Sequence, residues 1–256
     1  MVAASIYIPK DNMEYPCGQD AHFIDVASQT IGVADGVGGW SKHGIDSGEY
    51  ARQLITNSII ALHENHKAGR HVDPKRVIEE AYSHTTAPGS STACIVALSG
   101  EDNMLRAANV GDSGFLVIRD GAVLYKSPAQ QRSFNHPYQL GATSGCDGPS
   151  VAEEIEVRAE KGDVVVLGTD GLLDNAHATE ISEIVCRGVM EWKDVMEFCC
   201  SVANVAHCNS FDTHRDTPYS IGARKAGYTS RIGGKVDDIT VIIAMIEEQR
   251  FPVPVI

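Results

Sequence analysis

The stretch TIGVADGVGGW, residues 30–40, joins an apolar run directly to an aspartate and a string of glycines. Its first half, Thr30 to Ala34, predicts a β-strand. Asp35 therefore lies at a strand end, where Gly36 leaves the backbone free to turn. A carboxylate at the edge of a sheet is a hard oxygen ligand, so this stretch predicts a strand and a cation ligand together.

Four other short acidic segments recur at long intervals, nearly all beside an apolar run. They are Gly18-Gln19-Asp20, Gly111-Asp112-Ser113, Gly168-Thr169-Asp170-Gly171 and Asp237-Asp238-Ile239-Thr240. Several aspartates that converge at sheet edges can hold hard divalent cations such as Mg²⁺ or Mn²⁺. The spacing of these segments therefore predicts one polar site assembled from distant parts of the chain.

The sequence between these segments separates into blocks of strands and blocks of helices. Period-two patterns and apolar runs predict strands within 23–34 (two, around Ser28-Gln29), 91–98, 104–110, 114–118, 122–125, 163–168 and 236–246. Helical spacing and capping signals predict helices over 46–66, 73–82, 178–189 and 192–206. The strands from 91 to 125 predict a meander with a hairpin turn at Asp120-Gly121. Residues 126–149 predict a long irregular segment that could border a substrate.

This segregation of helices and strands favours a layered α+β fold over a doubly wound one. No linker divides the 256 residues, so we expect a single domain over 1–256. A net charge of −13 without a long basic run argues against nucleic acid or an anionic membrane as partner. No apolar stretch is long enough to insert into a bilayer. Seven cysteines, an odd number in mostly apolar surroundings, predict buried thiols and an intracellular, reducing compartment.

Two other interpretations of the motifs are weaker. Gly111-Asp112-Ser113-Gly114 is similar to the nucleophile segment of trypsin-like proteases, but no Gly-Pro follows and no early His-Cys pair precedes it. Residues 32–40 are glycine-rich but lack the order of a dinucleotide-binding loop. Asp120-Gly121 and Asp147-Gly148 are typical of ordinary turns.

In their order, the motifs resemble those of the metal-dependent protein phosphatases of type 2C. The resemblance rests on GQDAH (18–22), DGVGGW (35–40), SSTA (90–93), NVGDS (109–113), DGLLD (170–174) and DDIT (237–240), and it spans almost the whole chain. The GVGGW variant and HPYQL (136–140) are similar to the branch found in plant and fungal organelles. The resemblance implies a four-layer α-β-β-α sandwich, two central antiparallel sheets flanked by helices. It also implies a monomer and a chloroplast or mitochondrial location.

The resemblance implies a serine/threonine phosphatase that hydrolyses phosphoserine or phosphothreonine in a phosphoprotein substrate. Two Mg²⁺ or Mn²⁺ ions would activate a bridging water, so no protein nucleophile is needed. Asp35 would bridge the two ions, Asp170 and Asp237 would complete the first site, and the Gly36 carbonyl would belong to the second. Asp20 would act at the second site or orient its waters, and Asp112 with Asp170 would hold a third, weaker ion. The supporting residues around the metals would be Gln19, Thr92, Asp174 and Asp238.

Three positions depart from the family pattern. Gln19 stands where glutamate is usual, Val37 where many members have a proton-donating histidine, and Tyr15 where an arginine often grips the phosphate. The proton donor would then be His22, His43 or a metal-bound water, and the phosphate would be neutralised by Lys10, Lys42, Arg132 or the metals. These departures motivate an alternative hypothesis, a phosphatase-like module that binds phosphoproteins with weak or no turnover.

Overall fold

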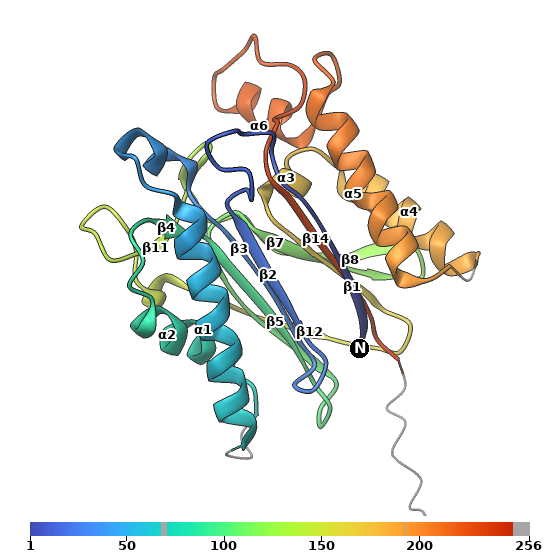
Figure 1. The fold of residues 1–256 in the computed structure, drawn as a ribbon. Helices are drawn as coiled ribbons and strands as arrows, with labels where there is room; N and C mark the ends of the chain where they lie inside the picture. Colours follow the sequence, from blue (N-terminus) through green and yellow to red (C-terminus); the bar gives the residue numbers. More distant parts are fainter. Residues whose placement is uncertain (68–70, 192, 248–256) are drawn as a thin grey trace, which may run out of the picture.

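The computed structural model describes residues 1–67, 71–191 and 193–247. Two antiparallel sheets stack face to face, and helices cover the outer face of each (Figure 1). The four-layer α-β-β-α arrangement that the sequence predicted is therefore confirmed. The order of the layers is one pair of helices, one sheet, the second sheet and the other pair of helices.

The first sheet has the strand order β1-β14-β13-β7-β8. Its strands are β1 (Val2–Ile8), β7 (Gly114–Arg119), β8 (Ala122–Lys126), β13 (Val164–Gly168) and β14 (Ile239–Met245). The second sheet has the order β12-β6-β5-β3-β2. It contains β2 (Asp20–Asp25), β3 (Thr30–Asp35), β5 (Ala93–Ser99), β6 (Met104–Val110) and β12 (Glu153–Arg158). Two short ribbons pair β4 (Ser90–Ser91) with β11 (Leu140–Gly141) and β9 (Gln131–Ser133) with β10 (His136–Pro137).

The helices pack in two groups on opposite sides of the sandwich (Figure 1). On the second sheet lie α1 (Ser47–Lys67) and α2 (Pro74–His84); on the first lie α4 (Ala178–Met190) and α5 (Val195–Phe211). Shorter helices are η1 (Gly38–His43), η2 (Pro149–Val151), α3 (Asp170–Leu173) and α6 (Pro218–Lys225). The predicted start of α2 is confirmed, because the Asp73 side chain accepts from the amides of Lys75 and Arg76 and proline occupies the first turn.

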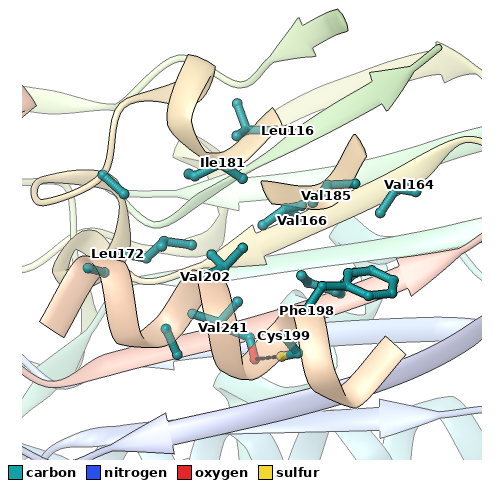
Figure 2. Close-up of a cluster of buried hydrophobic side chains, with 14 of the residues drawn as sticks. Leu116, Val164, Val166, Leu172, Ile181, Val185, Phe198, Cys199, Val202 and Val241 are labelled. Carbon is teal, nitrogen blue, oxygen red and sulfur yellow. Dashed lines mark hydrogen bonds between the residues drawn. The ribbon is translucent and has the colours of Figure 1, made fainter. Parts of the chain in front are cut away.

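Side chains alternate between the two faces of each strand, so the two sheets contribute to three hydrophobic cores. In β13, Val165 and Leu167 face the other sheet, whereas Val164 and Val166 face α4 and α5. Figure 2 shows Phe198, Cys199 and Val202 of α5 packed over this outer face. Each fully buried side chain of this kind contributes about 1.5–3 kcal/mol. A strand buried on both faces also explains why residues 164–167 are a continuous apolar run rather than an alternating one.

The predicted meander over 91–125 is wrong as a single sheet. β5 and β6 pair in the second sheet, whereas β7 and β8 pair in the first. The chain crosses between the sheets at Gly111-Asp112-Ser113, and this crossing places Asp112 at their common end. The Asp120-Gly121 hairpin turn is confirmed, with φ of 51° and 77°.

The strands β1 and β12 have no sequence prediction, and neither do α6 and the short helices η1, η2 and α3. The predicted helix over 192–206 is found as Val195–Phe211; Trp192 lies outside the described residues. Short strands interrupt the segment predicted to be irregular over 126–149. All seven cysteines are free, as predicted, and Cys94 and Cys199 are fully buried. The prediction of buried thiols is wrong for the other cysteines, because Cys186 and Cys200 are only partly buried and Cys17 and Cys208 are exposed. Within the described ranges no helix has the length and apolar character of a membrane span.

Candidate metal centre

Four aspartates from separate motifs line one cavity of about 420 Å³. Asp35 ends β3, Asp112 follows β6, Asp170 follows β13 and Asp237 precedes β14. The cavity therefore lies at the common end of the two sheets. The structure brings together the carboxylates that the sequence assigned to one site, although more than 200 positions separate the first from the last.

Two glycines allow the strand ends to come this close. A Cβ atom on Gly36 would lie 2.6 Å from the Ser47 carbonyl oxygen, and one on Gly171 would lie 1.9 Å from that of Asp238. Because no side chain fits at either place, the Asp-Gly pairs here are packing requirements as well as turns. Gly36 itself lines the cavity, as its predicted role requires.

Burial and mutual repulsion raise the pKa values of these carboxyl groups. Burial is the largest cause for Asp35, followed by the charge of Asp170, and the pKa is held well above its ordinary value. Burial and Asp170 likewise raise the pKa of Asp112 to about 7. Burial followed by Asp170 raises that of Asp237, against the opposing charge of Lys235. A cluster that resists ionisation in this way is stabilised when positive charge enters it.

Lys235 supplies such a charge, and the sequence analysis missed it. Its Nζ forms ion pairs with Asp170, with Asp174 at 3.2 Å and with Asp237 at 3.0 Å. Burial lowers the pKa of Lys235, but the three carboxylates outweigh burial and hold it above its ordinary value. No local motif marks this lysine; its only signal is its position two residues before Asp237.

Asp20 lies behind the cavity rather than in its wall. It sits opposite Asp35 in the β2–β3 pair, and its Oδ2 accepts from the hydroxyls of Thr169 at 2.8 Å and Thr240 at 2.7 Å. Burial, followed by the charge of Asp238, holds its pKa well above the ordinary value. Asp20 thus ties the second sheet to the strands that carry Asp170 and Asp237. Its role toward a metal stays a prediction.

The predicted supporting residues hold the backbone around these ligands. The Thr92 Oγ1 accepts from the Asp35 amide at 3.2 Å and is 2.7 Å from the Ser113 Oγ. Asp238 accepts from the Lys10 and Gln19 amides at 2.8 and 3.1 Å, so it fastens the loop that leads to Asp20.

Gln19 and Asp174 also lie at the site. The Gln19 Nε2 donates to the Ser47 Oγ at 2.8 Å, and Gln19 lines the cavity. Asp174 contacts Lys235; burial and the charge of Asp170, opposed by Lys235, raise its pKa to about 7.

The donor set fits hard divalent cations. The Oδ1 atoms of Asp112 and Asp170 are buried without a hydrogen-bond partner, so each offers an unused lone pair at the cavity. Among the described residues, no three His, Cys, Asp or Glu side chains are arranged so that they could hold a metal ion as they stand. The Lys235 ammonium instead lies among the carboxylates. A divalent cation in this cavity would therefore share some of its carboxylate ligands with Lys235.

Comparison with known proteins identifies the family. The family model for stage II sporulation protein E (SpoIIE) matches residues 27–192. The protein phosphatase PTC7 homolog fig of Drosophila willistoni is 38% identical over 258 residues, covering 94% of this chain and 81% of that protein. This chain belongs to the protein phosphatase 2C family. A probable protein phosphatase 2C 55 of Arabidopsis thaliana is 43% identical over 250 residues, 98% of this chain and 52% of the relative.

The chain spans about half the length of two of the Arabidopsis relatives it matches, 52% and 58%. The X-ray structure of the photosystem II phosphatase PBCP matches with a TM-score of 0.88 and 31% identity, over 96% of this chain and 98% of that one. The catalytic domain of the serine/threonine phosphatase PstP, in complex with two manganese ions, matches with a TM-score of 0.62 at 18% identity. The latter likeness shows the shared phosphatase 2C fold.

The two histidines that the sequence suggested as proton donors in place of Val37 lie outside the cavity lining. His22 contacts the Ser5 Oγ at 3.0 Å and His43 packs against Trp40, and neither lines the cavity. His136 does line it. In the sequence, His136 was notable only as the first residue of the HPYQL motif, and no chemical role was predicted for it.

Of the predicted cations, Lys10 and Lys42 line the cavity beside Val37. Arg132 is instead ion-paired with Asp147 and lies over the Tyr138 ring. The Tyr15 hydroxyl donates to Glu14. Both Arg132 and Tyr15 are absent from the described lining of the cavity.

Proposed function

We propose that this domain is a protein serine/threonine phosphatase that hydrolyses phosphoserine and phosphothreonine with two Mg²⁺ or Mn²⁺ ions. The observation that carries the proposal is the convergence of Asp35, Asp112, Asp170 and Asp237 on one cavity, with buried unpartnered oxygens on two of them. Such carboxylate clusters are the sites that hard divalent cations prefer.

This arrangement supports the following set of proposed metal ligands. Asp35, Asp170 and Asp237 with the Gly36 carbonyl would hold the two ions; Asp112 would join Asp170 at a weaker third, and Asp20 would act behind them. When bound, such a pair of ions supplies an activated bridging water for in-line attack on phosphorus and neutralises the phosphate. The remaining work, which is to bind the phosphate and protonate the leaving oxygen, belongs to the protein.

Lys10 and Lys42 line the cavity and supply positive charge for the phosphate. The Lys10 Nζ lies 3.6 Å from the Asp237 Oδ1, so its ammonium is already directed at the metal ligands. Lysine acts here as a flexible point charge, whereas an arginine would grip two phosphate oxygens at once. The missing family arginine at Tyr15 therefore predicts looser orientation of the phosphate.

His136 is the proton donor we propose for the leaving alkoxide. Its Nδ1 is 3.0 Å from the Phe134 carbonyl oxygen, which can only accept, so Nδ1 carries a proton. The Nε2 of the protonated ring is then free to donate its proton to the serine or threonine oxygen as the P–O bond breaks. This assignment compensates for Val37, which cannot transfer a proton.

The deciding experiment is phosphate release from a phosphothreonine peptide with Mn²⁺, with Mg²⁺ and with chelator. We expect metal-dependent release that chelator abolishes and that Asp170→Asn lowers at least about 100-fold, because even residues that only orient metal ligands are worth about 10- to 100-fold. Circular dichroism would verify that the variant is folded. Unchanged turnover by Asp170→Asn would refute the assignment.

The alternative is a phosphoprotein-binding module with weak turnover, which Gln19 favours because it withholds one carboxylate from the cavity. In that case the wild-type chain binds a phosphopeptide without releasing phosphate, and Gln19→Glu raises turnover. Brisk hydrolysis that Gln19→Glu leaves unaltered would eliminate this alternative. We further propose a monomer and, from the likeness to the photosystem II phosphatase, a plant-organelle compartment.

A further inference from the structure

A second pocket, of about 290 Å³, adjoins the metal-site cavity. Asn135 and His136 line both hollows, so the two share a wall. The other walls come from Phe134 and from the segment that begins with α6 and continues through Arg231. The function proposed above uses none of these other walls.

Aromatic rings form most of this pocket. The Phe134 ring centroid is 5.2 Å from that of Tyr219 and 5.9 Å from that of Tyr228, with interplanar angles of 39° and 44°. Rings at these distances attract one another and present faces and edges to a further ring. Tyr228 is nevertheless 60% exposed, so the group is an open surface rather than part of the core.

A cation lies beside the rings. The Arg231 guanidinium carbon is 5.1 Å from the Tyr219 ring centroid. Its backbone is fixed, since its amide donates to the Tyr228 carbonyl and its carbonyl accepts from Arg224. Arg224 pairs with Asp216, but Arg231 forms no ion pair within the described residues. A guanidinium is attracted to the face of an aromatic ring, so Arg231 can contact an aromatic side chain that enters the pocket.

Tyr219 connects this pocket to the metal centre. The Lys235 Nζ lies 5.7 Å from the Tyr219 ring centroid and also contacts Asp170. The Tyr219 ring therefore contacts Lys235, and Lys235 in turn contacts Asp170, a proposed metal ligand. An extended peptide advances about 3.3 Å per residue, so a side chain one to three residues from the phosphorylated position can reach the pocket.

We propose that this pocket binds an aromatic side chain of the phosphoprotein substrate, one to three residues from the phosphorylated serine or threonine. The proposal rests on the phosphatase function proposed above. Three rings against a single cation favour an aromatic over an acidic occupant, because Arg231 already stacks on Tyr219. The site would set which phosphorylated positions this enzyme selects.

The test compares phosphothreonine peptides that differ only by Phe or Ala at each of the three positions on either side of the phosphothreonine. For the wild-type chain with Mn²⁺, we expect kcat/KM to be about tenfold higher for Phe at one of these positions. Tyr228→Ala should reduce this Phe-to-Ala ratio to about twofold, and Tyr228→Phe should retain it. The matched control is Leu124→Ala, an exposed apolar residue on β8, which should also retain the ratio. A ratio cancels any loss common to both peptides.

Hydrolysis of p-nitrophenyl phosphate by the wild-type chain separates the two proposals. Its absence, together with silence on every peptide, would refute the phosphatase. Active hydrolysis with equal rates for Phe and Ala peptides at all six positions would overturn the pocket alone. A preference for Glu peptides that Arg231→Met removes would likewise overturn it, by assigning the pocket to an acidic side chain.

Discussion

The metal-free protein should lose stability as the pH rises from 6 to 8, and Asp112 should account for a measurable part of that loss. Burial and the neighbouring Asp170 raise the pKa of Asp112 to about 7 from an ordinary value of 3.8. A carboxyl group whose pKa is raised on folding adds stability below its unfolded pKa and loses it as the pH passes through its folded pKa. The loss therefore begins near pH 3.8 and is nearly complete at about pH 8, so the interval from pH 6 to 8 covers its last part.

The magnitude follows from proton linkage. At pH 6 a group with a pKa of about 7 is mostly protonated in the folded protein, and at pH 8 it is mostly ionised, whereas the unfolded chain is ionised at both. The free energy of unfolding should therefore fall by roughly 1.4 kcal/mol for this one carboxyl group. Asp174, whose pKa is also raised to about 7 by burial and Asp170, adds a similar amount.

Urea unfolding in chelator at pH 6 and pH 8, for the wild type and Asp112→Asn, measures this contribution. The asparagine variant cannot ionise at position 112, so its loss of stability between the two pH values should be smaller by about 1.4 kcal/mol. Taking the difference between the two proteins removes the contribution of histidines elsewhere. An equal loss in both proteins would refute the reasoning that Asp112 is held protonated by burial.

The same wild-type protein in saturating metal should lose most of this pH dependence, because bound cations keep the carboxylates ionised at both pH values. Cations compete with protons for these carboxylates, so metal binding should tighten as the pH rises. Metal at about one hundred times its Kd adds about 2.7 kcal/mol to the free energy of unfolding. Stability that falls as far from pH 6 to 8 in saturating metal as in chelator would contradict the assignment of the cavity as the metal site.

Two further substitutions test groups that the structure places at the cavity. Lys235→Met removes the ammonium that pairs with Asp170 and Asp174 and leaves Asp237 with Lys10 alone among the described cations. The metal-free protein should therefore lose about 3 kcal/mol in urea unfolding at pH 8, and Mn²⁺ should restore most of it. Unchanged stability would mean that the ion pairs contribute nothing. His136→Gln should lower kcat/KM for a phosphothreonine peptide by about 10² or more. It should affect p-nitrophenyl phosphate far less, since p-nitrophenolate leaves without a proton; an equal loss on both substrates would refute proton donation.

The convergence of the proposed metal ligands could be predicted because each is marked by local sequence. Asp35 and Asp170 follow apolar strands directly, and Asp237 precedes one, so strand alternation alone places all three at sheet ends. Their order along the chain then indicated the family. Gly36 and Gly171 were part of the same pattern, although the backbone contacts that require them become visible only in the folded chain.

What escaped prediction depends on long-range pairing. The period-two pattern of β5 to β8 is the same whether the strands share one sheet or two, so the crossing at Gly111-Asp112-Ser113 carried no local signal. The edge strand β12 (EEIEVR) fully buries only Ile155, and four of its six residues are charged, so it did not suggest a strand. Lys235 lay outside every motif, and only the pairing of β14 with β13 brings it beside Asp170.

The charge of the cavity predicts that this domain binds its cations before its phosphate. Five carboxylates and three ammonium groups line it, which gives a formal charge of −2 when all are ionised. A phosphate dianion would be repelled from such a cavity, and the lysines alone cannot reverse the sign. Two divalent cations change the charge to +2, which both relieves the aspartates and attracts the phosphate. Inorganic phosphate should therefore bind only in the presence of Mn²⁺ or Mg²⁺. Calorimetry that detected equal phosphate binding in chelator would place the phosphate outside the aspartate cluster, on Lys10 or Lys42 alone.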